Sequence, residues 1–242
     1  MTDKRYLVLG CKPWNRRVFD DVIRAYPGHW EYRDAPTALT LEMLRAMRPR
    51  YLFFLHWSSK VPPEITEQFE CVCFHMTDVP YGRGGSPLQN LIARGHRQTK
   101  LTALRMTAEM DAGPVYGKDD LSLEGNAEEI FIRATHQSAA LVARIAAEEP
   151  TPTPQNGPVT TFARRKPEQS AIDAAALGAA AGGGGASLSR LHDFFRMLDA
   201  DGYPRAYLDH NGFRYFFSRA TLYDGKIVAD VTITPLTTTE KP

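Results

Sequence analysis

The sequence has little cysteine, no long apolar run and almost no net charge. Its three cysteines are an odd number in a chain of 242 residues, which argues against a disulfide framework. No stretch approaches the roughly 18 to 20 apolar residues that cross a bilayer, and no signal-peptide core follows the start, so we expect a cytoplasmic protein without membrane contact. The 29 Lys and Arg residues balance 28 Asp and Glu residues, which disfavours a nucleic-acid partner.

Several cofactor motifs are also absent. The first expected strand ends in Gly10-Cys11-Lys12-Pro13, which lacks the second glycine of a dinucleotide-binding turn. The later glycine-rich loop does not have P-loop spacing. Cys71 and Cys73 would need two further ligands to hold zinc, and no second cysteine pair exists, so we expect no metal.

The first 150 residues alternate short apolar runs with helical patterns. This alternation predicts an α/β fold, a doubly wound and mostly parallel sheet, whose site lies at the carboxyl ends of its strands. The expected strands are residues 6–10, 51–55, 71–75, 101–106 and 115–123, and the expected helices are residues 17–23, 39–47, 86–94 and 127–147.

The composition changes after this first domain of residues 1–150. Residues 151–186 begin with a proline-rich strap that cannot form a helix and end with an Ala/Gly linker at 174–186 that offers too little side chain to bury. Residues 187–242 then predict a helix at 188–198 and a small antiparallel β module.

The β module contains two hairpin signals. Asn211-Gly212 and Asp224-Gly225 are typical two-residue hairpin turns. The alternating Phe213, Tyr215 and Phe217 are explained equally well by a homodimer surface and by packing on the main domain.

Polar side chains gather where the strand 71–75 ends. Alternation puts Cys71, Cys73 and His75 on one side of that strand, with His75 at its carboxyl end. The turn between the next two strands contains Asp111, and we expect it to carry this carboxylate to the same rim. Taken alone, a strand-end histidine is more often a structural hydrogen-bonder, and an aspartate in a turn often bonds its own backbone.

Two separated blocks of this sequence carry a recognisable pattern. The first block is His75-Met76-Thr77 with Pro80, then Arg83-Gly84 and Ser86-Pro87-Leu88-Gln89, and the second is Thr99-Lys100-Leu101-Thr102 followed by Asp111-Ala112-Gly113. The first block resembles the His-Pro-Ser-Leu-Leu-Pro, Arg-Gly and Ala-Pro-Ile-Gln segments of the N10-formyltetrahydrofolate-dependent formyltransferases, and the second resembles that family's Thr-Gly-Val-Thr and Asp-Ala-Gly segments. The similarity covers nearly all of the chain. The resemblance implies the family's Rossmann-like fold.

The resemblance also implies transfer of a formyl group to an amine through a tetrahedral intermediate. The family's catalytic histidine and aspartate fall on His75 and Asp111, and its asparagine falls on Cys73. A thiol is a much weaker donor than a carboxamide, so another group should bond the developing oxyanion. The candidates are His56, Ser58, Thr77, Gln89, Asn90 and the backbone N–H groups of the glycine-rich loop.

Further site residues follow from the same resemblance. The formylated folate is expected on Trp57, Ser58, Ser59 and Lys60 and, across the pocket, on Met110, Asp111 and Gly113. The acceptor is expected on Thr77, Arg83, Gly84 and Gly85, although Arg83 is equally suited to pairing with a nearby carboxylate.

The expected acceptor is a small-molecule amine. By analogy with the sugar N-formyltransferases, it would be a nucleotide-linked amino sugar of a bacterial surface-glycan or nonulosonic acid pathway. One alternative is a hydroxyornithine-like amine in siderophore assembly. A second is a folate-binding protein that has lost turnover, because Cys73 replaces the family asparagine.

Overall fold

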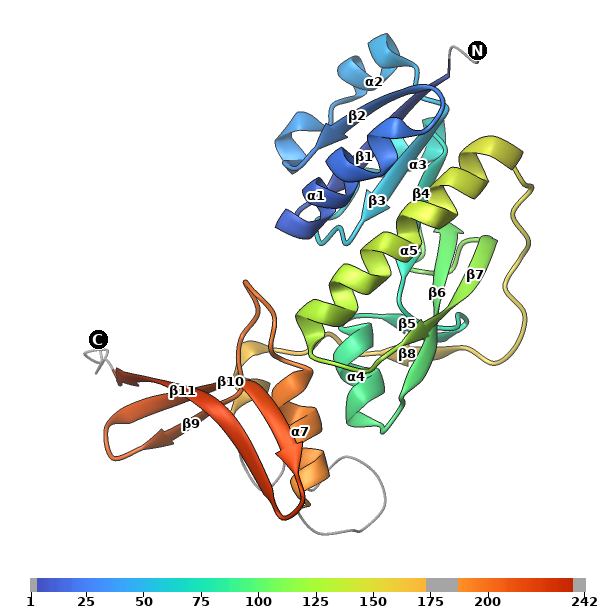
Figure 1. The fold of residues 1–242 in the computed structure, drawn as a ribbon. Helices are drawn as coiled ribbons and strands as arrows, with labels where there is room; N and C mark the ends of the chain where they lie inside the picture. Colours follow the sequence, from blue (N-terminus) through green and yellow to red (C-terminus); the bar gives the residue numbers. More distant parts are fainter. Residues whose placement is uncertain (1–3, 173–186, 237–242) are drawn as a thin grey trace. The chain divides into compact units, whose positions relative to one another are not determined.

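The structure is a computed structural model that describes residues 4–172 and 187–236 (Figure 1). The chain forms two compact units, each described here by itself. The linker expected at 174–186 lies outside the described residues. The first unit comprises the chain up to residue 87 with residues 98–121 and 131–162, and the second comprises residues 88–97, 122–130 and 163 onward.

A six-stranded sheet forms the centre of the first unit, in the order β2-β1-β3-β4-β6-β7. The pairs β1–β2, β1–β3 and β3–β4 are parallel, whereas β4–β6 is antiparallel. The mostly parallel α/β sheet expected from the sequence is therefore confirmed. The strands are β1 (Arg5–Gly10), β2 (His29–Arg33), β3 (Tyr51–Leu55), β4 (Cys71–His75), β6 (Gln98–Arg105) and β7 (Val115–Ser122).

One face of this sheet packs on α2 (Leu41–Met47) and α3 (Pro63–Gln68). Alternate strand residues enter the apolar core on this face, and Cys73, Trp57 and Met106 pack against its rim. The core residues are Leu7, Leu9, Leu39, Leu44, Met47, Leu52, Phe54, Val61, Ile65 and Cys71.

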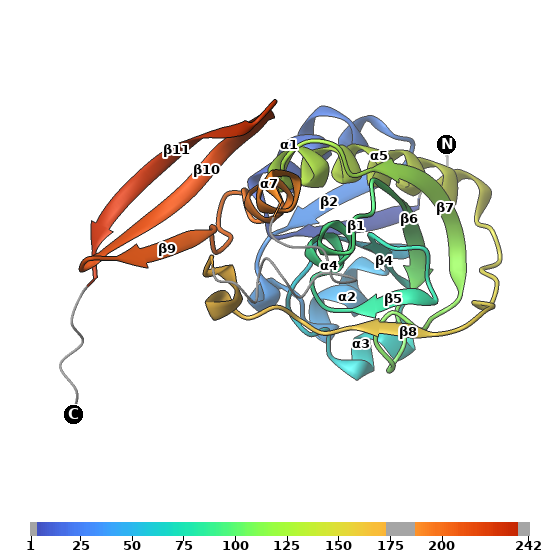
Figure 2. The ribbon, with the colours of Figure 1, turned by 90° about the horizontal axis from the view of Figure 1, so that it is seen from below.

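The other face carries α1 (Pro13–Asp21) and the part of α5 (Ala127–Glu148) that belongs to this unit (Figure 2). Asn15 joins the two helices by donating to the Thr135 hydroxyl at 3.2 Å, and Tyr6 on β1 donates to the Ala146 carbonyl. The helix α1 begins earlier than the expected residue 17, because Pro13 suits the first helical turn and the Asn15 side chain accepts from the Lys12 N–H.

A two-stranded parallel sheet holds the strap against the first unit. It joins β5 (Tyr81–Gly84), in the glycine-rich loop, to β8 (Thr160–Phe162). Neither strand was predicted from the sequence, and β2 and α3 were also missed. These four elements are short or mixed in polarity, so they lack the periodic pattern that identifies longer elements.

The second unit contains a three-stranded antiparallel sheet of β9 (Tyr207–His210), β10 (Phe213–Tyr223) and β11 (Lys226–Pro235). The small antiparallel β module expected at the C-terminus is thus confirmed. The helix α7 (Leu188–Arg196) packs on it through Phe195, whose ring stacks on Phe217 at 4.9 Å. The helix α4 (Pro87–Ala93) joins this unit where Gln89 donates to the Met197 carbonyl.

Residues 4–172 and 187–236 contain neither a membrane-spanning helix nor a cluster of metal ligands. None of their helices is both long and apolar enough to cross a membrane. These residues also include no group of three His, Cys, Asp or Glu side chains placed to hold a metal ion.

Candidate active site

His75 is the last residue of β4 and lies at the edge of the sheet where β1 and β3 also end. Its side chain is only 9% exposed. The ring atom Nε2 lies 2.8 Å from the carbonyl oxygen of Gly82, and Nδ1 lies 3.5 Å from the Asp111 atom Oδ2. The sequence predicted that His75 and Asp111 meet at this rim, and the structure has this arrangement.

The contact with Gly82 fixes the role of each ring nitrogen. A carbonyl oxygen only accepts, so Nε2 must carry a proton and donate it there. In the neutral imidazole Nδ1 then keeps its lone pair, and this lone pair faces the Asp111 carboxylate. The pair therefore presents a ring lone pair and a carboxylate oxygen at the same point of the site.

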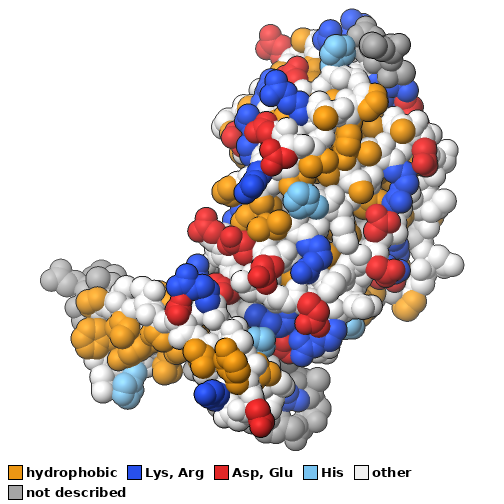
Figure 3. All heavy atoms as spheres, viewed as in Figure 1, with side chains coloured by type: hydrophobic (Ala, Val, Ile, Leu, Met, Phe, Trp, Pro, Cys, Tyr) orange, Lys and Arg blue, Asp and Glu red, His pale blue; other side chains and the backbone are white. Residues whose placement is uncertain are grey.

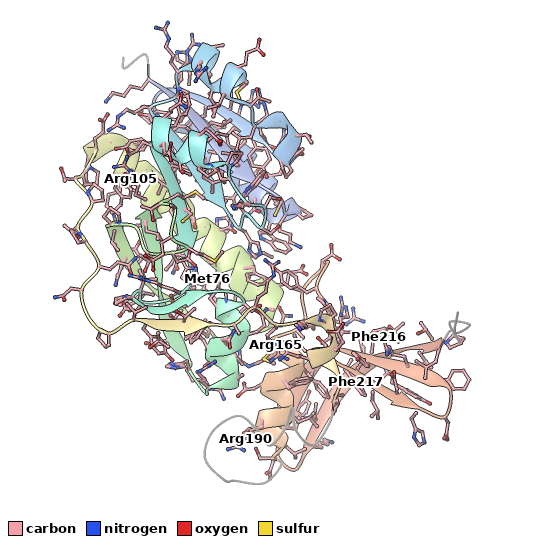
Figure 4. All side chains as sticks on the ribbon, turned by 180° about the vertical axis from the view of Figure 1, so that it is seen from behind. Met76, Arg105, Arg165, Arg190, Phe216 and Phe217 are labelled. Carbon is pink, nitrogen blue, oxygen red and sulfur yellow. The ribbon has the colours of Figure 1, made fainter. Side chains whose placement is uncertain are left out.

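Asp111 reaches His75 by an indirect path. The strand β6 runs antiparallel to β4, and the Met106 N–H donates to the Cys71 carbonyl, so the loop that follows β6 leaves at the start of β4. Figure 4 labels Arg105, which pairs with Val72 near the start of β4, and Met76, which follows the last residue of β4. The loop must fold back along the sheet to bring Asp111 to the carboxyl end, where its Oδ2 accepts the Gly84 N–H at 2.9 Å.

Gln155 in the strap fastens this returning loop. Its Nε2 donates to the carbonyls of Asp111 and Gly113 at 2.7 and 2.8 Å, and its Oε1 accepts two bonds from the Arg83 guanidinium at 3.0 and 2.9 Å. Asp111 has a φ of 53°, a left-handed conformation that costs energy for a non-glycine residue. The bonds from Gln155 therefore stabilise a backbone conformation that would otherwise be sparsely populated.

Gly113 is required at its position by a close approach. A Cβ atom there would overlap with the carbonyl oxygen of Arg105 on the other side of the loop. Gly113 thus allows the close approach of the two sides of the loop. Its contact with folate stays a prediction.

Cys73 lies on the same face of β4 as His75, partly buried against the apolar core. Burial raises the pKa of its thiol far above the ordinary range, and the negative charge of Asp111 raises this pKa further. The thiol is therefore protonated and unreactive at neutral pH, which leaves a weak hydrogen-bond donor where the resemblance implies a carboxamide.

The loop after β3 contains the four residues expected to bind folate, Trp57, Ser58, Ser59 and Lys60. The Trp57 ring packs edge-on against Phe54 at 5.9 Å. Its Nε1 is buried and has no hydrogen-bond partner among the described residues. Buried indole N–H groups usually have a partner, so this atom is suited to a ligand acceptor. Lys60 is exposed, and Ser58 lies 3.8 Å from the Cys11 sulfur.

Several residues expected at the acceptor are already engaged elsewhere. Thr77 is fully buried and donates to the Gly82 carbonyl at 3.2 Å, so the prediction that it contacts substrate is wrong. The N–H groups of Gly84 and Gly85 donate to Asp111 and to the Phe162 carbonyl, which removes both as oxyanion donors. Arg83 pairs with Glu109 at 3.3 Å as well as with Gln155, which is the carboxylate pairing left open by the sequence.

The candidates for replacing the family asparagine are reduced in the same way. Gln89 donates to the Met197 carbonyl and Asn90 to the Ala163 carbonyl, all within the second unit. His56 and Ser58, in the loop after β3, remain. Met110, expected to touch folate, is 71% exposed beside Asp111.

Asp78 and Gln155 lie near the site, and both side chains have partners in the structure. Asp78, which is close to His75 in sequence, pairs with Lys118 at 2.5 Å and so has a structural partner in its own loop. Gln155 was not proposed as a site residue. The available signal was the resemblance of Pro154-Gln155 to the family's linker, and only the fold shows that this strap returns to the Asp111 loop.

Comparisons of sequence give a consistent result. A family model described as the C-terminal domain of methionyl-tRNA formyltransferase matches residues 167–234. The methionyl-tRNA formyltransferase of Microcystis aeruginosa is 33% identical over 134 residues, which are 52% of this chain and 41% of that protein. The chain spans about half the length of the curated relatives that it matches.

Comparisons of structure extend over both units. The solved structure of a methionyl-tRNA formyltransferase from Clostridium thermocellum is 39% identical, with a TM-score of 0.89 over 96% of this chain and 99% of that one. A 4-N formyltransferase from Francisella tularensis, 15% identical, shares the fold with a TM-score of 0.67 over 89% of this chain and 96% of its own.

Proposed function

This chain belongs to the formyltransferase family that includes the methionyl-tRNA formyltransferases, and from that premise we propose that it moves a formyl group from N10-formyltetrahydrofolate to a primary amine. The observation that carries the proposal is the pair formed by His75 and Asp111, which presents a single proton-accepting site at the edge of the sheet. Formyl transfer needs such a site, because the attacking nitrogen must lose a proton.

The proposed reaction makes one bond and breaks one. The neutral amine attacks the formyl carbon, and a C–N bond forms while negative charge develops on the carbonyl oxygen. The bond between that carbon and N10 then breaks, and N10 takes up a proton. The acceptor nitrogen loses one proton to the pair of His75 and Asp111, which passes it on to N10, and the products are a formamide and tetrahydrofolate. The Gly82 carbonyl accepts from Nε2 and so keeps the lone pair of Nδ1 directed toward the Asp111 carboxylate.

The loop after β3 fits the donor. The orphaned Nε1 of Trp57 supplies a donor for a polar edge of the pterin, and its ring supplies an apolar surface beside it. Exposed Met110, next to Asp111, offers apolar contact on the other side of the formyl group. Trp57 and Met110 are therefore the residues that we assign to folate.

For the acceptor we favour a nucleotide-linked amino sugar. The charges of the C-terminal module support a small molecule, because residues 167–234 contain six Lys and Arg against eight Asp and Glu. Transfer RNA needs a cationic face, and four of the five arginines in residues 167–234 are held in ion pairs. These pairs are Arg196–Asp193, Arg205–Asp199, Arg214–Asp209 and Arg219–Asp230.

Methionyl-tRNA is the second candidate acceptor. It is favoured by the relatives, because the match to residues 167–234 and the structure from Clostridium thermocellum are both described as methionyl-tRNA formyltransferase. A hydroxyornithine-like amine would use the same His75 and Asp111 chemistry but would need a clamp for its carboxylate.

One assay separates these acceptors. The purified chain is mixed with formylated folate and one acceptor at a time, and release of tetrahydrofolate is followed by absorbance. We expect release with a nucleotide-linked amino sugar and none with the free sugar, hydroxyornithine or charged initiator tRNA. Release with charged tRNA alone would overturn the small-molecule acceptor. Binding of folate without release from any amine would instead support the folate-binding reading.

A further inference from the structure

Arg83 lies on β5 between the two residues whose backbone groups hold the proposed proton-accepting pair. The Gly82 carbonyl accepts from His75, and the Gly84 N–H donates to Asp111. The side chain of Arg83 is only 13% exposed. The structure therefore places a mostly buried positive charge close to the atoms that would react.

Gln155 fixes one edge of the Arg83 guanidinium. The Nε and Nη2 atoms both donate to the Gln155 atom Oε1, at 3.0 and 2.9 Å. The same amide group donates to the Asp111 carbonyl, so the guanidinium is tied to the loop that carries the carboxylate. A guanidinium has five N–H groups, and this arrangement leaves the outer edge, formed by Nη1 and Nη2, for another partner.

The partner on this outer edge is held weakly. Among the described residues it is Glu109, whose Oε1 lies 3.3 Å from Nη1 and whose side chain is 78% exposed. Strong arginine–carboxylate pairs have two shorter bonds, as Arg214 and Asp209 have in this chain at 2.7 Å each. A single exposed contact of this kind contributes little to stability, so Glu109 is readily displaced.

The shape of the loop does not depend on the Glu109 side chain. The Glu109 carbonyl accepts from the Thr107 hydroxyl at 3.0 Å and from the Ala112 N–H at 3.4 Å, which closes the turn that contains Asp111. The carboxylate can therefore leave Arg83 while these backbone bonds keep the turn in place. Its role is that of a counter-ion.

We propose that the outer edge of the Arg83 guanidinium binds a diphosphate group of the acceptor, and that Glu109 is the counter-ion which this group displaces. The inference rests on the proposed transfer to a nucleotide-linked amino sugar and assigns the part of it that Arg83 recognises. A guanidinium edge can bind two phosphate oxygens at once. Figure 3 shows positive and negative side chains interspersed over the face that it draws, so no broad cationic surface there competes for the anion.

The charge of the displacing group sets the specificity. Glu109 belongs to the same chain as Arg83, so its effective concentration is high and a free carboxylate of equal charge competes poorly with it. A diphosphate carries more negative charge and more acceptor oxygens, and it can therefore displace Glu109. The pair thus selects against an acceptor whose acid group is a single carboxylate, such as a hydroxyornithine-like amine.

Binding of simple anions tests this site without turnover. Inorganic pyrophosphate or acetate is titrated into the purified chain by calorimetry at low ionic strength, with no folate or amine present. We expect the wild type to bind pyrophosphate and not acetate. In Glu109→Gln, pyrophosphate should bind about two- to fivefold more tightly, the equivalent of one exposed ion pair, and acetate binding should become measurable. Arg83→Lys keeps the charge but loses the two-nitrogen edge, so pyrophosphate should bind about tenfold more weakly.

Glu42→Gln is the matched control, because it removes the same charge from an exposed position of α2. Its affinity for pyrophosphate should equal that of the wild type. Equal affinities in the wild type and Glu109→Gln overturn the proposal, and so does pyrophosphate binding of full strength in Arg83→Lys. Acetate binding as tight as that of pyrophosphate in the wild type overturns the preference for a diphosphate. Thermal unfolding identifies misfolded variants, and if Arg83→Lys is one of them, the comparison of Glu109→Gln with the wild type decides.

Failure of this site and failure of the proposed activity give different results. Pyrophosphate binding that depends on Glu109, without release of tetrahydrofolate by any amine, would retain the anion site and remove the activity. Release of tetrahydrofolate by a chain that binds no pyrophosphate would retain the activity and overturn the site.

Discussion

The Nδ1 atom of His75 lies 3.5 Å from Oδ2 of Asp111, and the opposite ring nitrogen is held by the Gly82 carbonyl. This relationship predicts that the charge of Asp111, and not only its shape, is needed for turnover. In Asp111→Asn the amide oxygen can still accept the Gly84 N–H, but the residue can no longer share a proton with His75. We expect turnover to fall roughly 10²- to 10⁴-fold, the usual loss for general base catalysis, in the tetrahydrofolate-release assay.

Asp78→Asn provides the control for this loss. Asp78 is close to His75 in sequence but pairs with Lys118 at the surface. Its variant should retain full turnover. Equal losses in the two variants would show that the effect comes from net charge, and full activity in Asp111→Asn would remove the carboxylate from the mechanism.

We also expect a loss of turnover when the position of the Asp111 loop is disturbed through Gln155. Gln155→Glu keeps the shape of the side chain and an acceptor for Arg83, but it replaces the two bonds to the Asp111 and Gly113 carbonyls by repulsion. The Asp111 loop should shift, and displacements of about 1 Å can cost on the order of 100-fold in rate. We expect kcat to fall about 10- to 100-fold while the KM for the amine changes little.

The neighbouring Asn156 supplies the matched variant. Asn156 is exposed, so Asn156→Asp introduces the same charge one residue away without touching the loop. Its kcat should equal that of the wild type. If Gln155→Glu changed KM and left kcat intact, Gln155 would be a binding residue and the positioning role would be refuted.

Much of the fold could be predicted from sequence, and particular residues show why. The apolar run from Tyr51 to Leu55 is fully buried, as a strand covered on both faces should be. The Asn211-Gly212 turn joins β9 to β10 because both residues adopt the positive φ that such turns require. Local pattern determines these elements, and no distant contact is needed to identify them.

The parts of the site that depend on distant contacts were not predictable. The position of Asp111 depends on a loop that leaves β6 at the far end of β4 and returns, and on a strap residue that bonds to it. The side chain of Thr77 is directed inward by Gly82, a contact that spacing alone does not reveal. Motif matching locates the residues of a site, whereas their accessibility follows from the whole chain.

We expect substitution of Cys73 to change turnover little, although the resemblance places Cys73 at the position of a catalytic asparagine. Burial and the nearby charge of Asp111 keep the thiol protonated, so it contributes at most a weak S–H donor. We expect Cys73→Ala to reduce turnover by less than about tenfold, because the loss of a strong oxyanion donor costs roughly 10²- to 10³-fold. A loss as large as that of Asp111→Asn would instead give the sulfur a direct role in the reaction.

Buried His56 should make the free energy of unfolding depend on pH. Burial lowers the pKa of its imidazole to about 4, and the positive charge of Lys12 acts in the same direction. Between pH 6.5 and 4 the unfolded chain then binds a proton at His56 that the folded chain refuses, so the free energy of unfolding decreases as pH falls through this window. One proton gives a slope of at most about 1.4 kcal/mol per pH unit.

His56→Asn isolates this contribution. His56 has a φ of 48°, and asparagine tolerates this left-handed conformation better than most residues. The variant should show a flatter dependence on pH than the wild type in chemical unfolding followed between pH 4 and 7. His210→Asn, at an exposed position of β9, should keep the slope of the wild type. Parallel curves for the wild type and His56→Asn would mean that the imidazole of His56 is protonated equally in the folded and unfolded chain, and would assign the acid sensitivity to other groups.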